Sequence, residues 1–141
     1  MRFSIAAAST ALLALAEARI TGIKVPKEIA AGEPFEVIIV RENYIQSVFD
    51  SSIVFGYAPP AQYPGTIGQI LGSFALGKAE SNKVGPLKKK LTVPEGTKGV
   101  DGLITAALFS IYGSSGSPTI SEYNVTVFFG DKTSDEYASS S

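Results

Sequence analysis

Two neighbouring stretches, GLITAALFSIY (residues 102–112) and TISEYNVTVFF (residues 119–129), decide the fold of this chain. In the second, apolar and aromatic residues such as Tyr123 and Val127 alternate with polar ones, which is the period of a strand with one buried face. The first is apolar at almost every position, which indicates a strand covered on both faces. The GSSGSP segment between them, residues 113–118, predicts a hairpin loop.

The same pattern extends outward from this hairpin over most of the chain. Glycine and proline interrupt it about every ten residues, as in β-sandwiches and barrels. The further strand candidates cover residues 20–26, 35–40, 51–57, 70–76 and 87–93. About seven strands in about 110 residues predict an all-β fold, an immunoglobulin-like antiparallel β-sandwich. It has no disulfide, because the sequence contains no cysteine.

The N-terminal segment has the composition of a secretory leader. Arg2 supplies a positive charge, an apolar run covers residues 5–16, and AEA (residues 16–18) has the small-x-small pattern that signal peptidase cuts. The run is too short to span a bilayer. We therefore expect residues 1–18 to be a signal peptide that is cleaved after Ala18.

Residues 19–130 are expected to form a single β-sandwich domain, and the polar tail, residues 131–141, is predicted to be disordered. Loss of Arg2 and Glu17 takes the 12 basic and 13 acidic residues to 11 and 12, so the net charge stays at −1. This balance gives no electrostatic footprint for nucleic acid and no basic face for an anionic membrane. We expect neither nucleic-acid binding nor membrane insertion.

The composition excludes the commonest catalytic machinery. The chain has no histidine and no cysteine, which removes Ser-His-Asp triads, Cys-His dyads and standard zinc sites. We predict no catalytic residue, no metal ligand and no cofactor. Paired carboxylates are the remaining enzymatic alternative, and a hydrolase of this kind would depend on acids such as Glu42 or Asp50.

The sequence contains one motif for covalent modification. The triplet Asn124-Val125-Thr126 is an acceptor for N-glycosylation. Strand alternation directs Asn124 outward, and the leader directs the chain into the secretory pathway. We expect Asn124 to carry a glycan.

The block ENYIQSVFD, residues 42–50, joins two strand candidates without any glycine or proline. On one interpretation it is a plain connection, in which Tyr44, Val48 and Phe49 pack at the end of the core and polar side chains satisfy unpaired backbone groups. On the other it is a contact surface for a partner. The residues that would form this surface are Glu42, Asn43, Tyr44, Gln46 and Asp50.

The same block carries a family resemblance. ENYIQSV (42–48), LGSF (71–74), AALFS (106–110) and YNVT (123–126) make the mature chain similar to the necrosis-inducing secreted protein family of fungal effectors. Phe49 and the two serines that follow Asp50 depart from the family pattern.

The resemblance implies a non-enzymatic secreted protein that acts on plant hosts. Its expected partners are the co-receptor kinase of pattern-recognition receptors and a cytoplasmic kinase downstream of it. Binding would inhibit these kinases, suppress immunity and be able to induce host cell death. A cysteine-free core is compatible with a reducing host cytosol as well as with the extracellular space, and we expect a monomer. The alternative from another class is a structural or carbohydrate-binding sandwich of the fungal cell wall, for which Tyr57, Tyr63, Tyr112 and Tyr123 would be the aromatic platforms.

Overall fold

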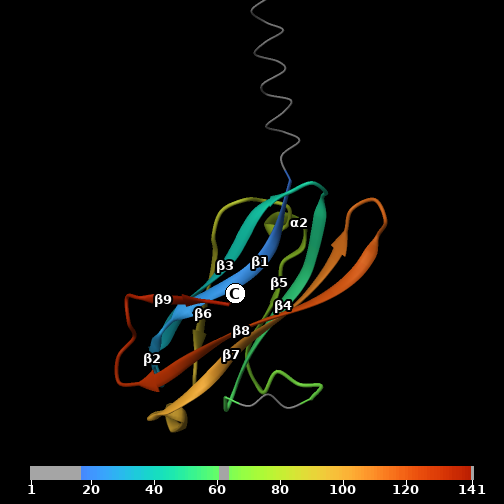
Figure 1. The fold of residues 1–141 in the computed structure, drawn as a ribbon. Coiled ribbons are helices and arrows are strands. Elements are labelled where there is room, and N and C mark those ends of the chain that lie inside the picture. The colour runs from blue at the N-terminus through green and yellow to red at the C-terminus, as the bar shows by residue number, and fades with distance from the viewer. Residues whose placement is uncertain (1–16, 61–63, 141) are drawn as a thin grey trace, which may run out of the picture.

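The structure, a computed structural model, describes residues 17–60 and 64–140. Two sheets pack face to face in this part of the chain (Figure 1), one with strand order β6-β3-β1-β9 and the other with order β2-β8-β7-β4-β5. The strands are β1 (Glu17–Pro26), β2 (Glu28–Ala30), β3 (Pro34–Tyr44), β4 (Val48–Ala58), β5 (Gln69–Ala75), β6 (Leu87–Thr92), β7 (Val100–Tyr112), β8 (Ser117–Gly130) and β9 (Tyr137–Ser139). A one-turn helix, α2 (Gly77–Glu80), and a 3-10 turn, η1 (Glu95–Thr97), lie in the connections. No helix in the described ranges is long and apolar enough to cross a bilayer.

The two sheets are held together by the residues that alternation directs inward. Ile23 and Val37 from one sheet meet Phe55, Ile104 and others from the second, and all of these are fully buried. Each fully buried large aliphatic or aromatic side chain contributes about 1.5–3 kcal/mol. The predicted all-β sandwich is therefore confirmed.

Strand β7 is central, as its composition predicts. It pairs antiparallel with β4 on one side and with β8 on the other. Its inward residues Ile104, Ala106 and Leu108 lie in the core, whereas outward Phe109 is 39% exposed. The inward face of the strand is thus buried, whereas its outward face is only partly covered and is open to solvent toward the C-terminal end.

The strand count differs from the expected seven. Nine strands occur among the described residues, because β2 and β9 add to the seven that the sequence indicates. Both have three residues, which is too short to show a period of two. β2 also pairs parallel to β8, so the second sheet is mixed.

Of the two predicted terminal segments, the signal peptide lies mostly outside the described residues, and the C-terminal tail differs from the prediction. The expected signal peptide covers residues 1–16, which lie outside the described residues, together with Glu17 and Ala18, which begin β1. The expectation that the C-terminal tail is disordered is wrong for residues 131–140. There β9 pairs antiparallel with β1, and the Tyr137 hydroxyl donates to the Glu36 carbonyl at 3.0 Å.

The tail is ordered because it satisfies backbone groups at the edge of the sandwich. The Thr133 and Ser134 hydroxyls accept from the N–H groups of Ala30 and Glu28, each at 3.1 Å. The Ile23 carbonyl accepts from the Ser140 N–H at 3.0 Å. A composition that is polar throughout hides these contacts, since they use backbone and hydroxyl groups and not apolar side chains.

Deletion of residues 131–141 should therefore destabilise the fold. We expect the free energy of unfolding to fall by at least about 3 kcal/mol, because several hydrogen bonds of about 0.5–1.5 kcal/mol each are lost. Urea titration of the full and shortened chains measures the difference. Tyr137→Phe, which removes only one hydroxyl, should cost about 1 kcal/mol. Equal stability of the full and the shortened chains would contradict the ordered tail.

Candidate functional site

The block 42–50 forms one end of the sandwich. It contains the end of β3, a turn at residues 45–47 and the start of β4. The turn lies at the top of the molecule in Figure 1, beside the start of β1. Glu17 and Arg19 of β1 are in register with Tyr44 and Glu42. We call the turn and its flanking residues Glu42–Ser47 the tip.

The tip is fixed by contacts to both sheets. The Gly113 N–H of the β7–β8 hairpin donates to the Ser47 carbonyl at 2.8 Å. The rings of Tyr44 and Tyr112 meet edge to face with centroids 5.7 Å apart, and the Arg19 guanidinium carbon lies 4.3 Å from the centre of the Tyr44 ring. Edge-to-face aromatic pairs and cation–π contacts each contribute on the order of 1 kcal/mol. The tip is thus a rigid connection and not a free loop.

A rigid tip presents a mixed surface. Glu42, Asn43 and Gln46 are exposed and Tyr44 is half-buried, as the contact-surface interpretation requires. Ile45 at the centre of the turn is 87% exposed, and the sequence analysis did not include it. The signal that could have found it is an isolated apolar residue within an otherwise polar turn.

Asp50 has a different position from the one expected. Its side chain is 1% exposed, and its carboxylate accepts from the Ser110 hydroxyl at 2.8 Å. Its backbone N–H donates to the Ser81 hydroxyl at 2.8 Å. The expectation that Asp50 belongs to a contact surface is therefore wrong. A hydrolase that uses Glu42 and Asp50 together also lacks support, since the second carboxylate is closed to solvent.

The cause is a β-bulge in β4. The β4–β7 register shifts between Asp50 and Ser52, so Ser51 is an extra residue that reverses the alternation. Strict alternation from inward Ile53 and Phe55 places Asp50 outward; with the bulge it lies inward, opposite Ser110. Sequence periodicity cannot show this reversal.

The bulge also decides the positions of the two residues before Asp50. Val48 is buried, as the plain-connection interpretation expects. Phe49, which that interpretation also places in the core, is 44% exposed, and this part is wrong. Phe49 lies on the outward face of β4, in register with Ile111 of β7.

Phe49 belongs to an apolar cluster on the outward face of the five-stranded sheet. Along the strands from the Phe49–Ile111 pair, Ser52 pairs with Phe109 and Phe109 pairs with Ile120 of β8. Ile120 is 74% exposed. We call Phe49, Phe109, Ile111 and Ile120 the outer patch. Ile111 is half-buried and the other three are exposed, and neighbouring exposed apolar residues of this kind mark interaction surfaces.

Burial shifts the pKa of the Asp50 carboxyl. Desolvation raises its pKa above the ordinary value of 3.8, against the opposite effects of the Ser110 hydrogen bond and the Arg41 charge. A buried carboxylate held by one hydroxyl is a structural group. It fixes the bulge against β7 and does not face a substrate.

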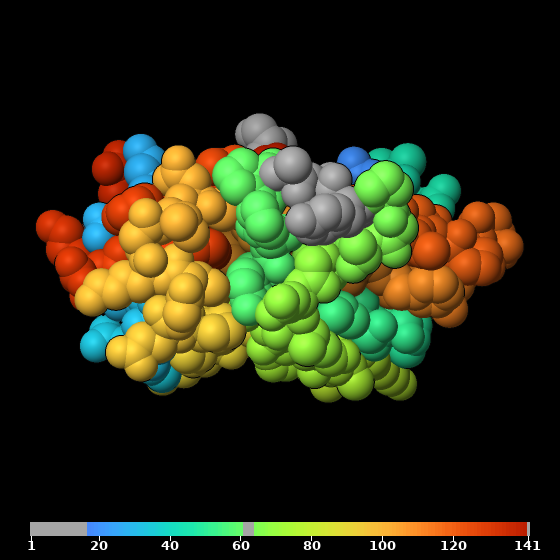
Figure 2. Space-filling model, turned by 90° about the horizontal axis from the view of Figure 1, so that it is seen from below, coloured from blue at the N-terminus to red at the C-terminus, as the bar shows by residue number. Residues whose placement is uncertain are grey.

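A hollow lies at the opposite end of the sandwich. Figure 2 looks onto this end, where the gold segment that contains Thr97 and Val100 and the green segment that contains Tyr57 and Gly68 flank it. The cavity has a volume of about 530 Å³. It is lined by Tyr57, Ala58, Pro59, Pro60, Gly68, Gln69, Thr97, Val100, Asp101 and Phe129.

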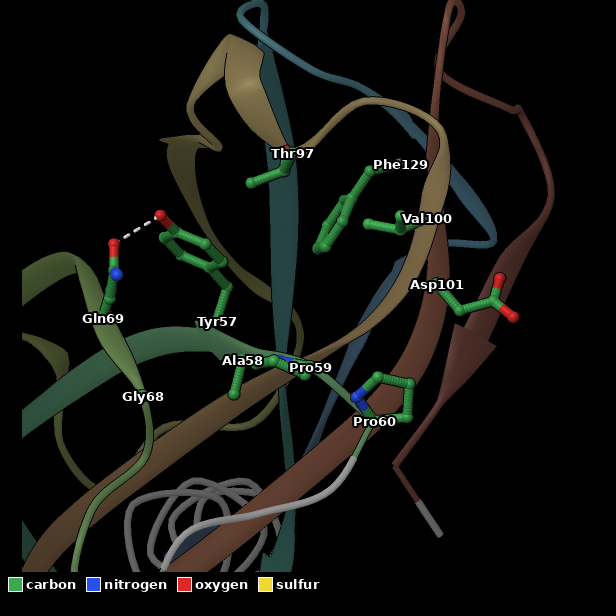
Figure 3. Close-up of a pocket in the computed structure, with 10 residues that line it drawn as sticks. All are labelled: Tyr57, Ala58, Pro59, Pro60, Gly68, Gln69, Thr97, Val100, Asp101 and Phe129. Carbon is green, nitrogen blue, oxygen red and sulfur yellow. Dashed lines mark hydrogen bonds between the residues drawn. The ribbon is translucent and has the colours of Figure 1, made fainter.

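The hollow is mainly apolar, and the side chains of Tyr57, Gln69 and Thr97 are engaged in hydrogen bonds. The Tyr57 hydroxyl donates to the Gln69 side-chain carbonyl at 2.6 Å, and the rings of Tyr57 and Phe129 meet edge to face. In Figure 3 the Asp101 carboxylate points away from these two rings. None of the residues expected to bind a partner lies here. Within residues 17–60 and 64–140, no group of three or more acidic side chains is placed to hold a metal ion.

Comparison with known proteins identifies the family of this chain. The Nis1 family profile matches residues 16–128. The chain belongs to the Nis1 family. It is 48% identical over 135 residues to necrosis-inducing secreted protein 1 of Colletotrichum orbiculare, covering 95% of this chain and 83% of the relative. It is 49% identical over 140 residues to the protein of the same name in Colletotrichum higginsianum, covering 99% of this chain and 96% of the relative.

The family resemblance inferred from the sequence is thereby confirmed. Both relatives are named as secreted proteins, and this Nis1-family protein is extracellular. Neither relative is named as an enzyme.

Solved structures give only distant likenesses. A superoxide reductase (neelaredoxin) variant from Ignicoccus hospitalis has a TM-score of 0.46 at 13% identity, covering 84% of this chain and 86% of that one. A cohesin module from a Clostridium perfringens family 33 glycoside hydrolase has a TM-score of 0.42 at 16% identity, covering 82% of this chain and 98% of that one.

The position of Asp50 predicts a pH-dependent stability. Because its folded pKa is raised, its contribution to stability is fully present below about pH 3.8 and is lost as the pH rises through the folded pKa. The stability of Asp50→Asn relative to the wild type should therefore improve between pH 3 and pH 7. The stability of Ser110→Ala relative to the wild type should instead fall between pH 3 and pH 7. At pH 7 this variant should be less stable by about 1.5–3 kcal/mol, since it leaves a buried carboxylate without its donor. Urea titrations at both pH values test this, and a pH-independent difference for Asp50→Asn would contradict it.

The glycosylation site at Asn124 remains a prediction that the structure allows. Asn124 and Thr126 are both exposed on the outward face of β8. We expect the secreted protein to lose mass when treated with an endoglycosidase that removes N-glycans. Asn124→Gln should abolish the shift, and an unshifted wild-type protein would show that the site is empty.

Proposed function

We propose that this protein is a secreted effector that binds and inhibits plant immune kinases, suppresses the immune response and is able to induce host cell death. The observation that carries the proposal is the tip, which projects an exposed isoleucine from a rigid and otherwise polar turn. The names of the two Colletotrichum relatives support necrosis induction. The kinases themselves, a co-receptor kinase of pattern-recognition receptors and a downstream cytoplasmic kinase, are the partners that the family resemblance implies.

The tip has the anatomy of a protein-binding surface. Ile45 supplies an apolar centre, and Glu42, Asn43 and Gln46 supply a polar rim. Interfaces combine an apolar centre with a polar rim in this way, and a small number of central residues carry most of the binding energy. Because the tip is already fixed by Tyr44 and the β7–β8 hairpin, binding orders little additional chain.

The fold is also suited to both sides of the plant membrane. The chain contains no cysteine, so its stability rests on the sandwich core and not on a disulfide. A reducing compartment removes nothing from such a core. The same folded surface would therefore be available in the extracellular space and in the host cytoplasm.

The wall-binding alternative has less support from the geometry. Of its candidate aromatic platforms, Tyr112 packs against Tyr44, Tyr57 is bonded to Gln69, and the Tyr123 hydroxyl donates to the Ile20 carbonyl. Tyr63 lies outside the described residues. Sugar binding uses open aromatic faces, and the three described tyrosines have their rings or hydroxyls engaged. A pull-down with cell-wall polysaccharides tests this alternative directly.

Binding of a plant kinase by the tip is the central test. The purified mature protein should co-precipitate a co-receptor kinase domain and lower its activity. Ile45→Glu should weaken binding at least about tenfold, since it places a charge at the centre of the interface. Ile70→Glu is the matched control, because Ile70 is 69% exposed on β5, away from the tip. No kinase binding at micromolar concentration, or equal losses in the two variants, would contradict the proposal.

A further inference from the structure

One edge of β8 is unpaired over most of its length in the part of the chain that the structure describes, and we call it the free edge. In the five-stranded sheet β8 lies between β7 and β2, but β2 pairs with it only at Phe128–Gly130. Figure 1 shows the other end of β8 on the outside of a hairpin arm that it forms with β7. Among residues 17–60 and 64–140, no strand pairs with the outer edge of residues 117–127.

The hydrogen bonds at the β2 end show which backbone groups point to this edge. The Phe128 N–H donates to the Lys27 carbonyl at 3.0 Å, and the Gly130 carbonyl accepts from the Ala31 N–H at 3.2 Å. Both partners lie on the β2 side of β8. Backbone N–H and C=O groups alternate between the two sides of a strand from one residue to the next, and the β7–β8 register has no shift over its whole length.

The even-numbered residues of β8 therefore direct their backbone groups to the free edge. These are Ile120, Glu122, Asn124 and Thr126. Pro118 agrees with this assignment, because a proline in a strand is tolerated where its missing N–H would face away from the ladder. An unpaired row of this kind is a template for another strand.

The side chains beside the edge indicate which strand would fit. Ile120 is 74% exposed and in register with Phe109 of β7, which is 39% exposed. Glu122 is exposed two residues further on, and it is the one acidic residue in the stretch 117–127. A strand added here would contact an apolar pair and then a single negative charge.

We propose that the free edge of β8 binds an extended segment of the partner by strand addition. The backbone of the segment pairs with Ile120 and Glu122, an apolar side chain of the segment lies beside Ile120, and a basic side chain lies opposite Glu122. Strand addition obtains affinity from main-chain hydrogen bonds and specificity from alternate side chains. The inference rests on the proposed function in one respect, since it assigns the segment to the kinase.

The outer patch lies between this edge and the strand that leaves the tip. Ile120 and Phe109 belong to the outer patch, and Phe49 of that patch follows the tip in sequence. A glycan on Asn124 would confine the added strand to the half of β8 nearer the hairpin loop. The partner would then cover the hairpin arm and the tip together.

The test compares two substitutions at one position. Glu122→Pro removes the edge-facing N–H and leaves the bonds of its neighbours to β7, because those face the other side. Glu122→Thr removes the same charge and keeps the N–H. We expect Glu122→Pro to weaken binding of the kinase domain at least about tenfold relative to Glu122→Thr, as for the loss of a central contact.

Amide exchange on the wild-type protein provides a readout that does not depend on a variant. The N–H groups of Ile120 and Glu122 should exchange at least about tenfold more slowly in the kinase complex, since bonded amides exchange only on opening. The Ser121 N–H, which faces β7, should change little.

Several results would overturn the inference. Equal binding of the two variants with no added protection at Ile120 and Glu122 would leave kinase binding intact and exclude the edge. Absence of wild-type binding would remove the proposed function and this inference with it. A wild-type dimer that Glu122→Pro converts to a monomer, with kinase binding unchanged, would show that the edge is taken by a second copy of the chain.

Discussion

The double pairing of β7 is the constraint on which the rest of the structure depends. This strand is bonded to β4 on one side and to β8 on the other over most of its length, so the direction of every side chain on three strands follows from its register. One face of the three strands supplies half of the core, with Phe55, Ile104 and Val127 among the buried residues. The other face carries the outer patch. A register slip of one residue would exchange the two faces.

The bulge at Ser51 reconciles this register with the sequence of β4. It allows Asp50 and Ile53, an odd number of residues apart, to face inward together. The buried carboxylate then accepts from Ser110 of β7, which satisfies the polar group that the bulge brings inside. The cost of burying the charge appears as the raised pKa of Asp50. The gain is that Phe49 and the tip lie on the outside at the same end of the sandwich, where the Gly113 N–H fixes the turn.

Much of the fold could be predicted, because its long strands bury one face and therefore alternate. The hairpin of β7 and β8 and the outward position of Asn124 both follow from alternation. The ordered tail could not be found in this way, since β9 is held by backbone and hydroxyl groups that leave no apolar pattern. The burial of Asp50 could not be found either, because one inserted residue reverses the alternation without any change in composition.

By itself, the sequence determined the class of fold, the family and the absence of histidine and cysteine chemistry, because these depend on composition, period and local motifs. Only the tertiary structure decided which residues of the block 42–50 are surface and which are core. It also decided that Ile45, Phe49, Phe109 and Ile120 share one end of the molecule and that no strand of the described residues pairs with the β8 edge beside them. The physical reason is that register and sheet order are set by pairing between segments far apart in the chain. A local pattern can specify that a strand exists, but not which neighbour it has or where its edge remains open.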